Sequence, residues 1–209
     1  MFEFHHPSLT LIIGPSQSGK TELLTKILNN ITRMMTPIPD TVEYYYEFWQ
    51  EGFKKLKDRG VNFKKGLPSA DELTENSLVI LDDKMEKLDQ LGAGLFTKII
   101  HHKNIGVITL MQNIFPKQLC ARTMSLNASY IILTSNKRDR SQISCLARQM
   151  RPGESRAILE AYDDATSVPF GYILFDFHQK SDDDLRLRTE IFPGERDVAY
   201  IKKNGGSSN

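Results

Sequence analysis

The chain has 209 residues, of which 40% are hydrophobic and 25% charged, so its composition is that of a globular protein and excludes wholesale disorder. No apolar run approaches the roughly 18 residues that a membrane-spanning helix needs, and the first residues lack the basic and apolar regions of a signal peptide. The net charge of +1, taken over the whole chain, argues against a polyanionic partner.

Length and composition also bound the domain organisation. We expect residues 1–200 to form a single domain and the polar, glycine-rich residues 201–209 to form a disordered tail. The two cysteines, Cys120 and Cys145, do not support a disulfide framework. They indicate an intracellular, reducing compartment, and no membrane partner is expected.

Short apolar blocks rich in Val and Ile predict buried strands. These blocks cover residues 9–13, 78–81, 107–111, 131–133 and 172–175. They hardly alternate with polar residues, which is typical of a parallel sheet covered by helices on both faces. Residues 41–48 do alternate and are aromatic, which predicts a further strand nearer an edge of the sheet.

Helical periodicity appears between these blocks. Apolar residues recur at three- and four-residue steps over 23–31 and again over 88–100. A third helix is expected from about Ser141 to Met150, with Asp139 as its N-cap and residues 151–153 beyond its end. The alternation of strands and helices predicts an α/β domain, doubly wound around a mostly parallel central sheet.

Residues 14–21 match the phosphate-binding consensus G-x-x-x-x-G-K-[ST] without deviation, between an expected strand and an expected helix. Gly14 and Gly19 permit the backbone angles with which successive N–H groups converge on phosphates. Lys20 would reach the β- and γ-phosphates, and Thr21 would offer its hydroxyl to Mg²⁺. The residues assigned to nucleotide binding are Gly14, Pro15, Ser16, Gln17, Ser18, Gly19, Lys20 and Thr21.

Two carboxylates directly follow the predicted strand 78–81. In P-loop enzymes an Asp at this strand end holds Mg²⁺, which assigns Asp82 to the metal. The next acidic residue can polarise the water that attacks the γ-phosphate, which makes Asp83 the candidate general base. Many such motors carry the longer Glu at this second position, so Asp83 departs from the common pattern.

The strand over 107–111 ends in two amides, Gln112 and Asn113. In a parallel sheet the carboxyl ends of the strands face the ligand crevice. An amide at that position can hydrogen-bond the γ-phosphate or the attacking water. We therefore assign Gln112 as the sensor of nucleotide state, with Asn113 as its alternative.

These blocks together resemble the FtsK–HerA superfamily of P-loop motors, especially the genome-packaging ATPases of Polinton-like and adintovirus-like elements and of large DNA viruses. The resemblance covers about residues 8–193. The P-loop is generic, and the later blocks make the match specific. Those blocks are residues 81–83, 101–104, 112–116, 122–127, 136–139, 146–150, 164–166, 171–174 and 188–193.

The resemblance implies an ASCE-type, RecA/FtsK-like P-loop NTPase. In such a fold an extra strand lies in the sheet between the P-loop strand and the acidic strand, and the strand predicted over residues 41–48 is consistent with this extra strand. It further implies hydrolysis of ATP with Mg²⁺ by a homo-oligomeric ring, pentameric or hexameric, that pumps double-stranded DNA. A capsid or portal protein is a further candidate partner, at sites of virus assembly in the host cell. In such rings a neighbouring subunit supplies an arginine finger, for which Arg122, Arg138 and Arg140 are the candidates.

The near-neutral total conceals a local excess of basic residues. Residues 117–156 contain eight basic and two acidic side chains, and acidic stretches elsewhere offset them. Such a segment is typical either of a phosphate-backbone partner or of a surface between subunits. A second basic segment, residues 54–65, is interleaved with Phe53 and Phe63 and is either a DNA-facing loop or a solvated linker. Because no groove-reading motif is present, DNA binding should be sequence-independent and sensitive to salt.

Two other interpretations stay open at this point. Asn136–Asp139 fits the N-K-x-D guanine-recognition pattern of regulatory GTPases, although Asp89, in a D-x-x-G sequence, lies past the strand end. The arginine-rich stretch resembles the lid of a small-molecule P-loop kinase. Finally, His101 and His102 are adjacent and point to different sides of a helix or strand, so they predict no metal site.

Overall fold

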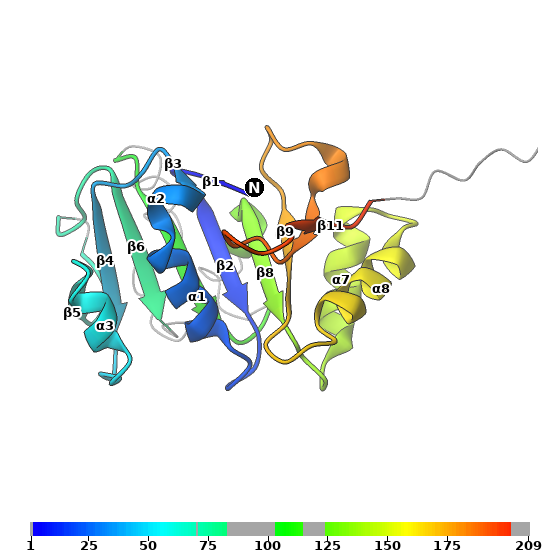
Figure 1. Ribbon diagram of the computed structural model, residues 1–209, viewed down its shortest axis with the longest axis horizontal. Coiled ribbons are helices and arrows are strands. Elements are labelled where there is room, and N and C mark those ends of the chain that lie inside the picture. Colours follow the sequence, from blue (N-terminus) through cyan, green and yellow to red (C-terminus); the bar gives the residue numbers. More distant parts are fainter. Residues whose placement is uncertain (1, 70, 83–102, 115–123, 202–209) are drawn as a thin grey trace, which may run out of the picture.

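The computed structural model describes residues 2–69, 71–82, 103–114 and 124–201. These residues form three layers, with a large central sheet between two layers of helices (Figure 1). The strands β2, β4, β6 and β8 all point the same way in Figure 1, so their carboxyl ends meet at the lower edge of the sheet.

Nine strands of the described chain form the central sheet, in the order β11-β10-β9-β8-β2-β7-β6-β4-β5, while β1 and β3 pair separately. The strands are β1 (Phe4–His5), β2 (Leu9–Ile13), β3 (Met35–Thr36), β4 (Thr41–Tyr46), β5 (Asn62–Lys65), β6 (Ser77–Asp82), β7 (Gly106–Met111), β8 (Tyr130–Thr134), β9 (Tyr172–Asp176), β10 (Leu187–Thr189) and β11 (Val198–Ala199).

The helices divide between the two faces of the sheet. They are α1 (Lys20–Asn29), α2 (Ile31–Met34), α3 (Phe53–Lys57), α7 (Arg140–Met150) and α8 (Ser155–Ala165), with a 3-10 turn at Asp183–Leu185. Helices α1 to α3 pack on one face in a core that contains Ile12, whereas α7 and α8 pack on the other, in a core that contains Leu11 and Ile13. Because successive strand residues face opposite sides, β2 is buried completely, as its apolar sequence predicts.

The helices predicted after the P-loop and after Asp139 are confirmed. Leu23, Leu24, Ile27 and Leu28 form the buried stripe of α1. At α7 the Asp139 side chain accepts a hydrogen bond of 3.2 Å from the backbone N–H of Ser141, which is the expected N-cap. The predicted helix over 88–100 and residues 202–209 of the predicted tail lie outside the described residues, whereas Ile201 is described and exposed.

The sheet is mostly parallel, as predicted, but β9 is not parallel to its neighbours. It runs antiparallel to β8, with Ile132 opposite Leu174, and β10 runs antiparallel to β9. The apolar sequence of β9 predicted a parallel strand, and this was wrong. Burial on both faces produces the same apolar sequence in either direction, because α8 and the C-terminal segment cover β9 as completely as a parallel strand would be covered.

The extra strand between the P-loop strand and the acidic strand is β7. It pairs with β2 on one side and with β6 on the other. The proposed assignment of this role to residues 41–48 was wrong, since β4 lies beyond β6, next to the edge strand β5. The expectation that residues 41–48 form a strand near an edge is confirmed. Sequence order did not determine sheet order here, because β7 inserts between two strands that precede it in the chain.

Candidate functional site

The P-loop connects β2 to α1 at the carboxyl edge of the sheet. Gly14 starts the loop and donates its N–H to the carbonyl of Met111 in β7, at 3.1 Å. Gln17 and Gly19 both have left-handed backbone angles, with φ of 64° and 93°. These angles turn the loop tightly into the first turn of α1, where Leu23 N–H donates to the Gly19 carbonyl at 2.9 Å.

Close contacts with β8 hold the start of the loop. A Cβ atom added at Gly14 would lie 1.8 Å from Oγ1 of Thr134, which only glycine avoids. The hydroxyls of Ser18 and Thr134 are 2.6 Å apart, and the Thr134 hydroxyl also donates to the Ile13 carbonyl at 3.3 Å. Thr134 is therefore a structural partner of the loop that sequence reasoning missed, although its place at the end of a predicted strand was a usable signal.

The lysine of the loop folds back onto the backbone of the loop itself. The Lys20 ammonium donates to the carbonyl of Gly14 at 2.7 Å and to the carbonyl of Pro15 at 2.8 Å. Thr21 is exposed in the first turn of α1. The cationic head of Lys20 thus lies across the mouth of the loop, where an anion can exchange for the carbonyl oxygens.

Asp82 ends β6 at the same level of the sheet as the P-loop strand. Leu110 of β7 pairs with Asp82 on one side and with Ile12 on the other. Because neighbouring strands are about 4.8 Å apart, the backbones of Asp82 and Ile12 are separated by about 10 Å. The register therefore brings Asp82 to the edge from which the P-loop rises. Asp83 lies outside the described residues.

Asp82 has a partner that the sequence did not suggest. The hydroxyl of Tyr44, a fully buried residue of β4, donates a hydrogen bond of 3.0 Å to Oδ2 of Asp82. Burial, followed by the adjacent Asp82 carboxylate, raises the pKa of Tyr44 above its usual range, so this hydroxyl stays protonated. It therefore orients the carboxylate as a fixed donor.

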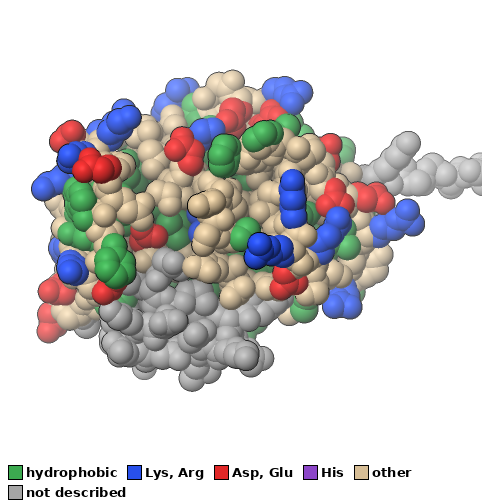
Figure 2. All heavy atoms as spheres, turned by 90° about the horizontal axis from the view of Figure 1, so that it is seen from below, with side chains coloured by type: hydrophobic (Ala, Val, Ile, Leu, Met, Phe, Trp, Pro, Cys, Tyr) green, Lys and Arg blue, Asp and Glu red, His purple; other side chains and the backbone are tan. Residues whose placement is uncertain are grey.

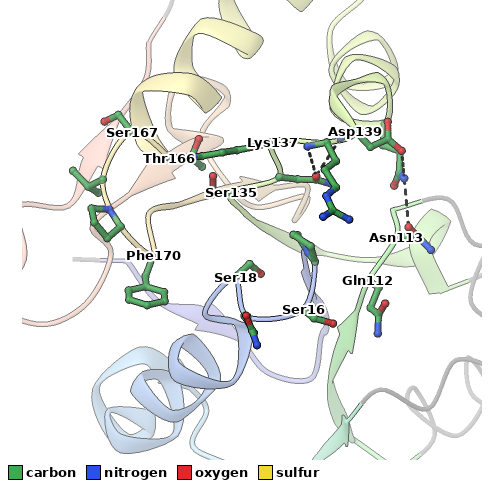
Figure 3. A pocket seen from close by; sticks show the side chains of 17 residues that line it. Ser16, Ser18, Gln112, Asn113, Ser135, Lys137, Asp139, Thr166, Ser167 and Phe170 are labelled. Carbon is green, nitrogen blue, oxygen red and sulfur yellow. Dashed lines mark hydrogen bonds between the residues drawn. The ribbon is translucent and has the colours of Figure 1, made fainter.

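A cavity of about 1010 Å³ opens above the P-loop (Figure 3). Its floor is the loop, with Ser16 and Ser18, and Gln112 and Asn113 lie on one side in the view of Figure 3. The lining residues are Pro15, Ser16, Gln17, Ser18, Gln112, Asn113, Ser135, Asn136, Lys137, Arg138, Asp139, Gln142, Thr166, Ser167, Val168, Pro169 and Phe170. The structure thus brings four of the predicted loop residues, Pro15, Ser16, Gln17 and Ser18, and the predicted sensor Gln112 to one cavity, whereas Lys20, Thr21 and Asp82 are not among its lining residues.

The segment Asn136–Asp139 forms part of this cavity, but its polar groups are used locally. The Asn136 side-chain oxygen accepts from the backbone N–H groups of Arg138 and Asp139, at 3.0 and 3.2 Å. Asp139 caps α7 and also accepts from the Gln142 amide at 2.6 Å, and Gln142 in turn accepts from the Ile114 N–H at 2.8 Å. This arrangement is that of a turn and a helix cap, and it disfavours the guanine-recognition interpretation.

The three arginine-finger candidates have different surroundings. Arg138 is exposed and lines the cavity, so within one subunit it lies beside the subunit's own P-loop. Arg140 forms an ion pair of 2.7 Å with Asp163 of α8. Arg122 lies outside the described residues. The structure therefore leaves Arg138 at the site and binds Arg140 to its own chain.

The basic excess of residues 117–156 is reduced in three dimensions. Helix α8 packs beside α7, and Asp163 of α8 reaches Arg140 of α7, while the other two ion pairs are local along the chain. Arg140 pairs with Asp163, Arg151 with Glu154, and Arg156 with Glu160. Figure 2 shows the carboxyl-edge side of the molecule, where basic side chains are interspersed with acidic ones rather than joined in one face.

The second basic segment is also more structured than predicted. Residues 54–65 form most of α3 and the strand β5 rather than a loop, and Phe53 is buried in the core. Lys64 pairs at 3.2 Å with the carboxylate of Glu43, whose side chain is only 4% exposed. Phe53 and Lys64 are therefore structural, and only the remaining lysines of this segment are available for an anionic partner.

The donor atoms of the described residues are chemically suited to a nucleoside triphosphate with Mg²⁺. A glycine cradle, left-handed backbone angles and an ammonium group converge on the loop, which suits phosphate groups. Thr21 and Asp82 offer hydroxyl and carboxylate oxygens, the ligands that Mg²⁺ prefers. Within the described ranges no cluster of three or more His, Cys, Asp or Glu side chains could hold a metal by itself.

No protein-family model matches the sequence, and no curated protein gives a significant match. Solved structures do match. The DNA-packaging ATPase B204 of Sulfolobus Turreted Icosahedral Virus superposes with a TM-score of 0.54 at 13% identity, over 82% of this chain and 94% of that one. The genome packaging NTPase B204 of Sulfolobus turreted icosahedral virus 2, in complex with AMPPCP, gives a TM-score of 0.54 at 13% identity, over 83% and 94%. This chain therefore has the fold of a P-loop ATPase, with a large, mostly parallel sheet flanked by helices.

Proposed function

We propose that the protein is a Mg²⁺-dependent ATPase that translocates double-stranded DNA and packages a viral genome into a capsid. The observation that carries this proposal is the order of the polar groups along the carboxyl edge of the sheet. Asp82 of β6, Gln112 after β7 and the P-loop after β2 follow one another across three adjacent strands. The similarity of the fold to a viral DNA-packaging ATPase supports the choice of substrate.

The described residues have roles that follow from their places, and the roles of Asp83 and Arg122 rest on the sequence alone. Lys20 exchanges its carbonyl partners for the β- and γ-phosphate oxygens and offsets their charge. Thr21 and Asp82 would hold Mg²⁺, which neutralises charge on the phosphates when bound. Gln112 orients the attacking water or reports the γ-phosphate, and Asp83 acts as general base. A neighbouring subunit supplies an arginine, for which Arg122, Arg138 and Arg140 are the candidates; Arg138 lines the cavity of its own subunit, and Arg140 forms an exposed ion pair with Asp163.

Assembly and DNA contact complete the proposal. A pentameric or hexameric ring would place the arginine of one subunit at the cavity of the next. Lys55, Lys57 and Lys65 are exposed beyond the core and are suited to phosphate contacts without base recognition. In the described part of the chain, no helix is long and apolar enough to cross a membrane. A capsid or portal protein is the further partner expected in the host cell, in a reducing compartment.

The test is ATP hydrolysis by assembled protein at low salt, with and without duplex DNA. Wild-type turnover should rise with DNA of any sequence and fall as salt increases. Lys20→Ala should lower turnover by at least about hundredfold, since it removes a group that stabilises transferring charge. Absence of ATP hydrolysis by the wild type would contradict the proposed ATPase activity. ATP hydrolysis that does not increase with DNA would contradict only the proposed DNA translocation.

A further inference from the structure

The cavity has a second wall whose role the phosphate chemistry does not explain. Residues 166–170 connect α8 to β9 and lie opposite Gln112 and Asn113 across the cavity (Figure 3). Short backbone hydrogen bonds fix this loop. The N–H of Ser167 donates to the carbonyl of Asp164 at 3.1 Å, and the N–H of Gly171 donates to the carbonyl of Val168 at 3.0 Å. The two ends of the loop are thus closed by backbone turns.

Phe170 is the unusual residue of this wall. Its side chain is 67% exposed, although an aromatic ring of this size is normally buried. Its backbone also has a φ of 59°, a left-handed conformation that is an outlier for a bulky residue. Exposure and backbone strain both oppose folding stability, and such combinations concentrate at sites that bind ligands.

The ring of Phe170 lies directly against the P-loop. A Cβ atom added at Gly19 would approach Cδ1 of Phe170 to 2.9 Å, so the glycine is what lets the ring come this close. Phe170 therefore stands beside the start of α1, at one end of the bound-phosphate track.

The order of the strands in the sheet indicates whether Phe170 lies toward the γ-phosphate or toward the nucleoside of a bound nucleotide. The hydrolytic groups Asp82 and Gln112 belong to β6 and β7, on one side of the P-loop strand β2. Phe170 precedes β9, on the other side of β2, beyond β8. A triphosphate whose γ-phosphate points to Gln112 consequently directs its nucleoside toward Phe170.

We propose that Phe170 is the base-stacking platform of the nucleotide site, with Val168 and Pro169 as its apolar flank. This inference rests on the proposed function, since it requires a nucleotide in the P-loop. Aromatic stacking is tolerant of base identity, because every base has a π-face. Phe170 therefore supplies affinity for the nucleoside rather than a choice between adenine and guanine.

The experiment compares two ligands in calorimetric titrations of the full chain with Mg²⁺: ATP, and inorganic tripolyphosphate, which lacks the nucleoside. Phe170→Ala should weaken ATP binding about tenfold, the size expected for one lost stacking contact, and leave tripolyphosphate binding within about twofold. Phe170→Trp should keep ATP affinity near the wild-type value. Phe48→Ala is the matched control, since it removes another exposed ring, 81% exposed, that does not line the cavity.

Each result separates the alternatives. Equal weakening of both ligands by Phe170→Ala would show that the ring only supports the loop at Gly19, and would overturn the proposal. Unchanged ATP binding would overturn it as well. If the wild type binds tripolyphosphate and ATP equally well, there is no base subsite, but the phosphate site stands. If the wild type binds neither ligand, the proposed function fails together with this inference.

Discussion

The hydroxyl of Tyr44 and the carboxylate of Asp82 are joined by a hydrogen bond of 3.0 Å, across two neighbouring strands of the sheet. The tyrosine is fully buried and its raised pKa keeps it a donor. A carboxylate that is to hold a metal is commonly oriented by such an outer partner. Asp82 is therefore fixed before any ligand arrives.

Tyr44→Phe should remove this orientation. We expect the Mg²⁺ concentration for half-maximal ATP hydrolysis to rise by about tenfold, within the range found for the outer partners of metal ligands. The free energy of unfolding should fall by about 1 kcal/mol, the net value of one hydrogen bond. A magnesium titration of turnover and a urea titration measure the two effects. Tyr46→Phe on the same strand is the control, and a Tyr44→Phe enzyme that titrates like wild type would exclude this role.

Asp139 separates the ATPase interpretation from the regulatory GTPase interpretation. Because its carboxylate caps α7 and accepts from Ser141 and Gln142, Asp139→Asn should leave the ratio of ATP to GTP affinity unchanged. Asp139→Ala should lower the melting temperature, since alanine cannot cap the helix. Nucleotide competition binding and thermal unfolding measure these outcomes. A large shift of preference toward another base in Asp139→Asn would support guanine recognition instead.

Glu43 is the centre of a buried polar cluster beneath the edge of the sheet. Its carboxylate accepts from the hydroxyls of Tyr45 and Thr74, at 3.0 and 2.6 Å, and pairs with Lys64. Glu43→Ala leaves these groups without their shared acceptor, so we expect a loss of about 3 kcal/mol in the free energy of unfolding. Denaturant titration measures the loss. Glu51→Ala, which breaks an exposed ion pair with Lys54, should change stability little, and equal effects of the two variants would contradict this account.

His6 should make stability depend on pH. Burial lowers the pKa of His6, partly opposed by the Asn104 backbone and by Asp40. The unfolded chain takes up a proton at about pH 6.5 and the folded chain resists it, so protons favour unfolding. The contribution to stability is complete above about pH 6.5 and is lost as the pH falls through the lowered pKa of the folded state.

Unfolding titrations between about pH 7 and pH 5 measure this dependence. His178, whose pKa burial also lowers, adds to it with the same sign. His6→Gln should therefore reduce the change of the free energy of unfolding with pH, and His178→Gln should reduce it further. If the free energy of unfolding of His6→Gln changes with pH as it does in the wild type, His6 does not cause the pH dependence.

Much of the site was predictable because its groups follow strands directly. The loop at Gly14 to Thr21, Asp82 and Gln112 each come immediately after an apolar block, and parallel strands bring their carboxyl ends to one edge. Thr134 also ends a strand and was overlooked. Phe170 was not predictable, since it stands in a short loop before an antiparallel strand and belongs to no consensus.

The charges of the surface show the limit of sequence reasoning most clearly. The local excess of basic residues was counted along the chain, but ion pairs form between α7 and α8, as Arg140 does with Asp163. Similarly, the lysines after β4 were interpreted as a loop, whereas Lys64 lies in an edge strand and pairs with buried Glu43. Pairing depends on which faces pack together, and composition contains no such information.

The sequence by itself predicted the phosphate-binding loop, because contiguous residues form its consensus, and the left-handed angle expected at Gly19 is present; the structure adds a second such angle at Gln17, whereas Gly14 is required by its close contact with Thr134. It also determined α1 and α7, through their apolar stripes and the Asp139 cap. The tertiary structure alone decided that β7 lies between β2 and β6, that β9 runs antiparallel, that Tyr44 reaches Asp82, and that Phe170 covers Gly19. These relationships depend on sheet order and on contacts between distant segments, which local patterns of hydrophobicity do not encode.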